Sequence, residues 1–122
     1  AQFHAQDTQA ATEIAQVAPA AEEYVVTAYT AGPESTGKTR SHPAYGITAS
    51  GERVQEGVTA ACPPEMPFGT VIAIEGVGER ICQDRGGAIK GRRIDVYIPD
   101  LQEALEFGRQ TLNVTILSEG AD

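Results

Sequence analysis

Short runs of β-forming residues, separated by Gly and Pro, follow one another along the chain from Tyr24 onward. Ile94, Val96 and Ile98 alternate with polar residues, so strand periodicity places these three on one face and Asp95 and Tyr97 on the other. The body of the chain is therefore predicted to be mainly β. The predicted strands cover residues 24–30, 70–75, 80–82, 94–98 and 112–117.

One helix is signalled after the strand at 94–98. Asp100 and Glu103 have the spacing of a capping box, while Leu101, Ala104 and Leu105 recur on one face and Gly108 marks the end. The stretch from Gly32 to Gly51 contains many Gly and Pro residues, which predicts a long loop with a further short strand at 45–49. Loops of this length in compact domains are usually functional.

Residues 1–23 have a different composition, rich in Ala, Gln and acidic residues and too poor in apolar residues to build a core. Their helix formers predict a helix over residues 8–16, which Pro19 would end. We expect residues 1–23 to form a linker or appendage, residues 24–118 to form a single domain, and residues 119–122 to form a C-terminal tail.

The formal net charge of −8 is concentrated near the two ends of the chain. Between residues 24 and 118 there are eleven acidic and nine basic residues, a net charge of −2. This part of the chain has no basic cluster beyond Arg92-Arg93, which argues against nucleic acid as a partner. A nearly neutral domain suits a neutral or mixed-charge ligand such as a glycan.

No stretch approaches the roughly 20 apolar residues of a membrane-spanning helix, and residues 1–10 lack the features of a signal peptide. We expect a soluble chain whose signal, if it is exported, has already been removed. The sequence contains no metal, nucleotide or flavin motif, so no cofactor is expected. Nothing in it indicates an obligate partner, so we also expect a monomer.

Cys62 and Cys82 are the only cysteines, and neither has a His or a second Cys at metal-ligand spacing. They form either a disulfide or two buried thiols. We favour the disulfide, because each cysteine adjoins a strand-like run and closing such a loop contributes about 3 kcal/mol to a small core. A disulfide implies an oxidising compartment outside the cytoplasm.

Two aspartates are candidates for chemistry. Asp84 ends a predicted strand before Gly86 and Gly87, which permit positive φ and close approach of a ligand, although a turn-capping role is an alternative. Asp95 is unusual within a strand, where a solvated face or a salt bridge to Arg92 or Arg93 is the alternative. If the two carboxylates face one cleft, their like charges raise the pKa of one, as a general acid for glycosidic cleavage requires.

Several sequence words resemble the 3D family, which is named for three aspartates and is related to the catalytic barrel of membrane-bound lytic transglycosylase A and to Sps-type muralytic proteins. The Asp84–Gly91 word and the following Asp95 are the most specific of them. The words, which come in the family's order, are Thr27-Ala28-Tyr29, YGITASG at 45–51, PFGT at 67–70, DRGGAIKG at 84–91 followed by Ile94-Asp95, and Ala104 to Arg109.

The resemblance implies a six-stranded double-psi β-barrel with one or two short helices, acting on peptidoglycan glycan strands between N-acetylmuramic acid and N-acetylglucosamine. It implies that Asp95 is the general acid and base, with Asp84 beside it tuning its protonation, and that the products are 1,6-anhydromuropeptides. It also implies a secreted or cell-wall location.

The resemblance further implies a saccharide groove, in which we also expect Gly86 and Gly87 to let the glycan approach the backbone. Lys90 and Arg92 are expected to meet acidic groups of the lactyl peptide. The other expected groove residues are Tyr29, Thr48 and Ser50.

One position departs from the family. Cys62, ahead of Pro63, stands where the first name-giving aspartate is expected. Two other functions therefore stay open: a noncatalytic, expansin-like wall-binding or accessory module, and a two-carboxylate glycosidase that uses water.

Overall fold

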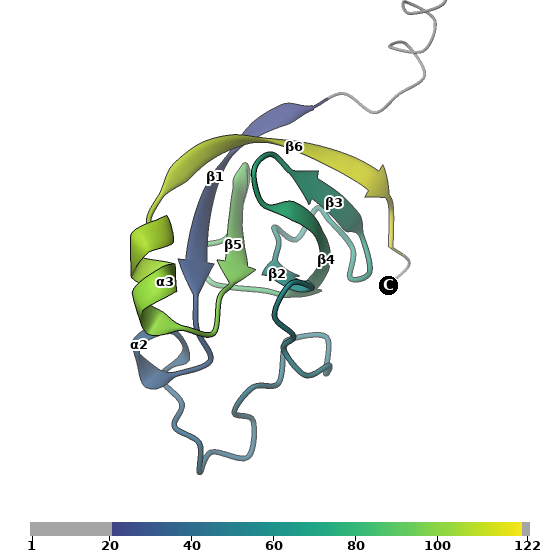
Figure 1. Cartoon of the computed structure of the whole chain (residues 1–122). Coiled ribbons are helices and arrows are strands. Elements are labelled where there is room, and N and C mark those ends of the chain that lie inside the picture. The colour runs from purple at the N-terminus through teal and green to yellow at the C-terminus, as the bar shows by residue number, and fades with distance from the viewer. Residues whose placement is uncertain (1–20, 121–122) are drawn as a thin grey trace, which may run out of the picture.

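The computed structural model describes residues 21–120 as a closed barrel of six strands with two short helices at one end (Figure 1). The strand order around the barrel is β1-β5-β2-β4-β3-β6. The elements are β1 Glu22–Tyr29, α2 Pro33–Thr36, β2 Thr59–Ala61, β3 Val71–Ile74, β4 Gly78–Asp84, β5 Arg93–Tyr97, α3 Leu101–Phe107 and β6 Gln110–Ser118. The predicted fold class is confirmed, whereas the helix predicted at 8–16 lies outside the described residues.

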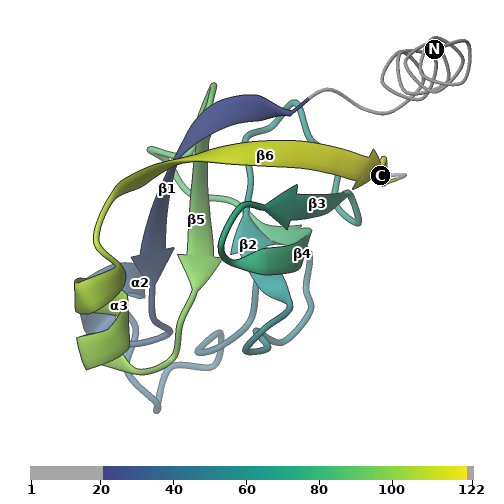
Figure 2. The ribbon, with the colours of Figure 1, turned by 45° about the horizontal axis from the view of Figure 1, so that its top comes forward.

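Two strand pairs are parallel, β1 with β5 and β2 with β4, and the other neighbours are antiparallel. A parallel pair needs a long crossover connection, since its strands cannot be joined by a tight turn. β6 pairs with both β1 and β3, crossing β1 and running alongside β3, which closes the barrel (Figure 2). The long connections leave the barrel wall as loops, and these loops surround the site described below.

The core has the alternation that the sequence predicts for β5. Ile94 and Val96 are fully buried among the other barrel residues, and Ile98 packs against them. Asp95 is on the opposite face, as is Tyr97, which packs against a second, smaller cluster. That smaller cluster consists of Tyr29, Ala61 and Ile89.

The sixth strand is not where the sequence placed it. Within 45–49, Ile47 makes only an isolated bridge to Arg53, and the strand that completes the barrel is β2, Thr59–Ala61. Alanine has little strand propensity, so nothing local marks Ala60 and Ala61 as a strand. Pairing with β4 and β5, together with burial on both faces of the barrel wall, decides their conformation.

The helix predicted after β5 is confirmed as α3. The Asp100 side chain accepts a 3.1 Å hydrogen bond from the backbone N–H of Glu103, and Gly108 caps the other end. Of its apolar residues, Ala104 is buried, whereas Leu101 and Leu105 are exposed. Helix α2 was missed, although Pro33 at its start and Gly37 at its end, with φ of 74°, are typical helix boundaries.

Cys62 and Cys82 form the predicted disulfide, with a Cα–Cα distance of 5.5 Å. Both cysteines are fully buried in the core. The bond ties the segment after β2 to β4, and the Cys62 N–H adds a 3.1 Å hydrogen bond to the carbonyl of Asp84. None of the helices within residues 21–120 is long and apolar enough to cross a bilayer.

Candidate active-site cleft

One row of register partners crosses four neighbouring strands of the barrel wall. Thr27 of β1 pairs with Asp95 of β5, Asp95 pairs with Ala61 of β2, and Ala61 pairs with Asp84 of β4. Neighbouring strands are about 4.8 Å apart, so the two aspartates are two strand spacings apart with only a methyl group between them. The fold thus brings Asp84 and Asp95 to one surface.

A β-bulge turns Asp84 toward that surface. Cys82 and Asp84 are two residues apart, so an unbroken strand would point both side chains into the core. The register shifts here: Ala60 pairs with Cys82, but Ala61 pairs with Asp84, which leaves Gln83 as the extra residue. Cys82 consequently stays in the core, whereas Asp84 faces the opposite side.

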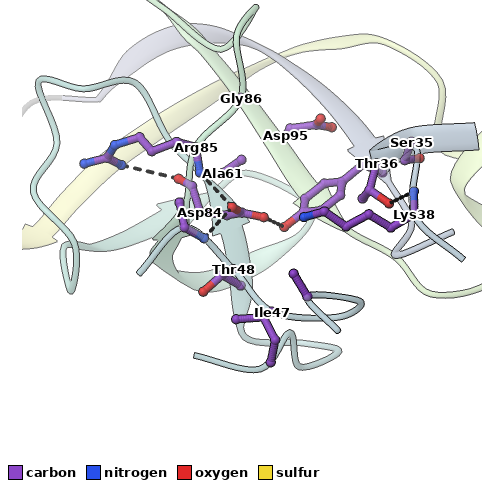
Figure 3. A pocket seen from close by; sticks show the side chains of 13 residues that line it. Ser35, Thr36, Lys38, Ile47, Thr48, Ala61, Asp84, Arg85, Gly86 and Asp95 are labelled. Atoms are coloured by element: carbon purple, nitrogen blue, oxygen red, sulfur yellow. Dashed lines mark hydrogen bonds between the residues drawn. The ribbon is translucent and has the colours of Figure 1, made fainter. Parts of the chain in front are cut away.

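Asp84 and Asp95 both line a cleft of about 430 Å³ (Figure 3). The segment that includes α2 forms one wall, and the loop at 44–49 together with the end of β4 forms the other. The lining residues are Tyr29, Ser35, Thr36, Lys38, Ala44, Ile47, Thr48, Ala49, Ala61, Asp84, Arg85, Gly86 and Asp95.

Three donors hold the Asp84 carboxylate. The Tyr29 hydroxyl donates to Oδ2 at 2.9 Å, and the backbone N–H groups of Ala49 and Arg85 each donate to Oδ1 at 2.9 Å. Burial, and next the neighbouring Asp84 carboxylate, raises the pKa of the Tyr29 phenol, so Tyr29 remains a donor. Asp84 is therefore a fixed acceptor that connects β1, β4 and the 44–49 loop.

Asp95 has a different environment. It is half-buried, and the Thr27 hydroxyl donates to its Oδ1 at 2.9 Å. Burial raises the pKa of Asp95, the Thr27 hydrogen bond and the charge of Arg93 oppose this rise, and the Asp84 charge adds a smaller increase. The direction matches the expectation for a general acid, but burial rather than the second carboxylate is its main cause.

Of the other residues expected in the groove, some line the cleft and others lie outside it. Tyr29, Thr48 and Gly86 line the cleft. Ser50 lines an adjoining pocket with Phe68 and Gln83, and its hydroxyl lies 2.9 Å from that of Thr48.

Gly87 and Lys90 are not among the cleft-lining residues, and Arg92 forms a 2.6 Å ion pair with Glu22. Neither Gly86 nor Gly87 has a positive φ. Space explains Gly86 instead, because a Cβ there would lie 2.9 Å from Cγ1 of Ile89. The sequence suggested a positive φ for this glycine pair, and neither glycine adopts one.

Sequence reasoning missed Arg85, which lines the cleft and braces its edge. Its guanidinium donates to the carbonyls of Cys62 at 3.3 Å, Asp84 at 3.3 Å and Met66 at 2.7 Å. It also stacks 4.1 Å from the ring centroid of Phe68. No sequence signal marks this role, because the acceptors are backbone carbonyls that only the fold brings together.

Lys38 was also missed, because it lies in a loop whose path the sequence does not fix. As for metals, residues 21–120 contain no group of three His, Cys, Asp or Glu side chains that could hold an ion. The cleft therefore presents two carboxylates in unlike environments, together with hydroxyl groups, a lysine and an arginine.

Comparison with known proteins gives one family model and several relatives whose names refer to the cell wall. The family model for the 3D domain matches residues 58–118, half of the chain. The cell wall-binding protein YocH of Bacillus subtilis is 38% identical over 77 residues, covering 60% of this chain and 27% of YocH. The putative cell wall shaping protein YabE of the same organism is 37% identical over 99 residues, covering 70% of this chain and 24% of YabE. The chain thus spans about a quarter of the length of these relatives.

Among solved structures, MltA from Escherichia coli, described as having a unique lytic transglycosylase fold, superimposes with a TM-score of 0.52. The sequences are 20% identical, and the match covers 62% of this chain and 28% of MltA. At this identity the likeness shows the fold alone.

Proposed function

Because the chain belongs to the 3D domain family, we propose that its barrel binds peptidoglycan glycan strands and cleaves the bond between N-acetylmuramic acid and N-acetylglucosamine as a lytic transglycosylase. The names of YocH, YabE and MltA support a role at the cell wall. The main support for this activity is that the Asp95 carboxyl lies in the cleft and that burial raises its pKa.

In this proposal the protonated Asp95 carboxyl donates its proton to the glycosidic oxygen as the bond to the muramyl C1 breaks. The resulting carboxylate then accepts the proton of the muramyl 6-hydroxyl while that oxygen bonds to C1. The products are a free 4-hydroxyl on the N-acetylglucosamine and a 1,6-anhydromuramyl end. Asp95 regains its proton, so no water is consumed.

Asp84 has a supporting role in the same proposal. Its two oxygens already accept three hydrogen bonds, from Tyr29, Ala49 and Arg85, which leaves little of its accepting capacity for an incoming water. A glycosidase that uses water needs a second carboxylate free for that task, or a nucleophilic one. The engagement of Asp84 therefore favours attack by the internal 6-hydroxyl.

We also propose that the protein works outside the cytoplasm. The buried Cys62–Cys82 disulfide supports this location, because structural disulfides form and persist in oxidising compartments. The cell wall functions in the names of YocH and YabE support it independently.

A second candidate is a noncatalytic wall-binding module. Cys62 in place of the family's first aspartate favours it, as does the name of YocH, a cell wall-binding protein. Both candidates predict binding to the wall, so only the products distinguish them.

The test is mass spectrometry of soluble products after purified peptidoglycan is incubated with the parent, Asp95→Asn or Glu56→Gln, an exposed carboxylate outside the cleft. The proposal expects 1,6-anhydromuropeptides from the parent and from Glu56→Gln, and a loss of about 10²-fold or more in Asp95→Asn. Binding without products would select the wall-binding module. Reducing ends in place of anhydro ends would select the water-using glycosidase.

A further inference from the structure

The cationic side chains near the cleft differ in whether another group of the protein already binds them. Arg85 donates to three backbone carbonyls and stacks on Phe68, and Arg92 is paired with Glu22. Lys38 has no carboxylate within ion-pair distance among residues 21–120. Of the two cations that line the cleft, Lys38 is therefore the one with its charge uncommitted.

The fold directs Lys38 into the cleft. Gly37 ends α2 in the left-handed conformation, and the Lys38 N–H donates a 3.1 Å hydrogen bond to Oγ1 of Thr36, which fixes the chain direction after the helix. Lys38 is half-buried, and its side chain runs from the α2 side toward the middle of the cleft (Figure 3). A half-buried lysine that faces a ligand-sized space is a candidate binding residue.

The charges of the cleft limit where an acidic ligand group can lie. Asp84 and Asp95 repel an anion at the floor, whereas Lys38, whose side chain extends from the α2 wall into the cleft, attracts one. Ser35 and Thr36 place hydroxyl groups on the same wall. A glycan whose acidic substituent points to Lys38 can therefore place its glycosidic oxygen near Asp95 while the anion is paired with a cation.

We propose that Lys38 and the α2 wall form a subsite for the carboxylate carried by the muramyl residue, either on its free lactyl ether or on its attached peptide. The inference rests on the proposed function, and it names the part of the substrate that the α2 side of the cleft recognises. It assigns recognition of the acidic group to Lys38 in place of Lys90 and Arg92, because Lys90 does not line the cleft and Arg92 is paired with Glu22.

The test measures binding in an Asp95→Asn background, so that turnover plays no part. The probes are a neutral N-acetylglucosamine hexamer, amidase-stripped glycan strands with free lactyl carboxylates, and strands that retain their peptides. Each is titrated calorimetrically against the Asp95→Asn protein and against versions that also carry Lys38→Gln, Lys38→Arg or Arg40→Gln. Arg40 is an exposed cation of the same loop that does not line the cleft.

We expect Lys38→Gln to weaken binding of carboxylate-bearing strands about tenfold while leaving the neutral hexamer unchanged. Lys38→Arg should retain most of the affinity, and Arg40→Gln should match the background protein. The two kinds of strand distinguish the carboxylates. If Lys38→Gln weakens binding of the stripped strands, Lys38 recognises the lactyl carboxylate, and if it weakens binding of the peptide-bearing strands, Lys38 recognises a peptide carboxylate.

Equal loss for neutral and acidic probes, or no loss in Lys38→Gln, overturns the Lys38 subsite while the proposed function stands. Failure of the Asp95→Asn protein to bind any of the three probes, with the parent also releasing no anhydromuropeptides, overturns the proposed function, and the subsite with it.

Discussion

The Tyr29 hydroxyl donates a 2.9 Å hydrogen bond to Oδ2 of Asp84, although their strands do not pair. β5 and β2 lie between β1 and β4 in the barrel order. Tyr29 reaches across them over Ala61, which packs with it in the smaller cluster. A methyl group at position 61 leaves room for this crossing, so the floor of the cleft depends on a small residue as well as on its polar ones.

Removing that hydroxyl should loosen the floor of the cleft. Tyr29→Phe leaves Asp84 with its two backbone donors and should lower the free energy of unfolding by about 1.5–3 kcal/mol, as expected for a hydrogen bond to a charged group. Urea denaturation measures this change. Tyr97→Phe is the matched control, because it keeps the ring that packs against Tyr29, and it should change stability by less than about 0.5 kcal/mol. Equal effects of the two variants would contradict the role of the Tyr29 hydroxyl.

The raised pKa of Asp95 predicts how stability depends on pH. A carboxyl with a higher pKa in the folded than in the unfolded chain, about 3.9, binds more protons when folded, so stability falls as pH rises from that value through the folded pKa. Asp95→Asn cannot ionise. Its stability relative to the parent should therefore increase across that window and stay constant above it, in urea denaturation series from about pH 3 to about pH 8. A difference that does not vary with pH would contradict the raised pKa.

Thr27 should lower the pKa of Asp95 through its hydrogen bond to the charged form. Thr27→Val keeps the shape of the side chain but removes the 2.9 Å donor, so the pKa of Asp95 should rise further. NMR titration of the Asp95 carboxyl carbon measures the midpoint directly. Thr27→Ser retains a hydroxyl and should leave the midpoint near that of the parent. A midpoint that stays the same or falls in Thr27→Val would refute this role.

Even a conservative replacement of Arg85 should destabilise the protein. A lysine cannot donate to three separate carbonyls while stacking flat on Phe68, so Arg85→Lys should lower the free energy of unfolding by about 1–3 kcal/mol. The control is Arg109→Lys, an exposed arginine outside the cleft, which should be nearly neutral. Thermal or urea unfolding compares them. If both variants match the parent, the bracing role of Arg85 is wrong.

The disulfide should contribute substantially to a core of this size. The combined substitutions Cys62→Ala and Cys82→Ala open a link between residues 20 apart, and should lower the free energy of unfolding by about 3 kcal/mol. In the native parent, both cysteines are fully buried, so a thiol reductant should act slowly before unfolding and rapidly after it. Thiol labelling followed by mass spectrometry measures both rates. Rapid reduction of the folded parent would contradict complete burial.

The sequence by itself determined the features that depend on neighbouring residues. The alternation of Ile94 to Ile98 places Asp95 opposite the core, since the strand period is two. Asp100 and Glu103 mark the start of α3, because a cap acts within one turn. The closed barrel was predicted from the family resemblance of the words between Thr27 and Arg109, because these local patterns do not specify it.

The tertiary structure alone decided how the candidate site is assembled. β2 is a strand because Ala60 and Ala61 are buried and pair with β4 and β5. The bulge at Gln83 that turns Asp84 outward exists only in the pairing of β2 with β4. Arg85 is held at the cleft by backbone carbonyls of residues 62 and 66, which are far from it in sequence, and Lys38 reaches the cleft only because the barrel places the end of α2 beside Asp84 and Asp95. Such contacts have no period and no motif, so the residues that shape this cleft become visible only when the barrel closes.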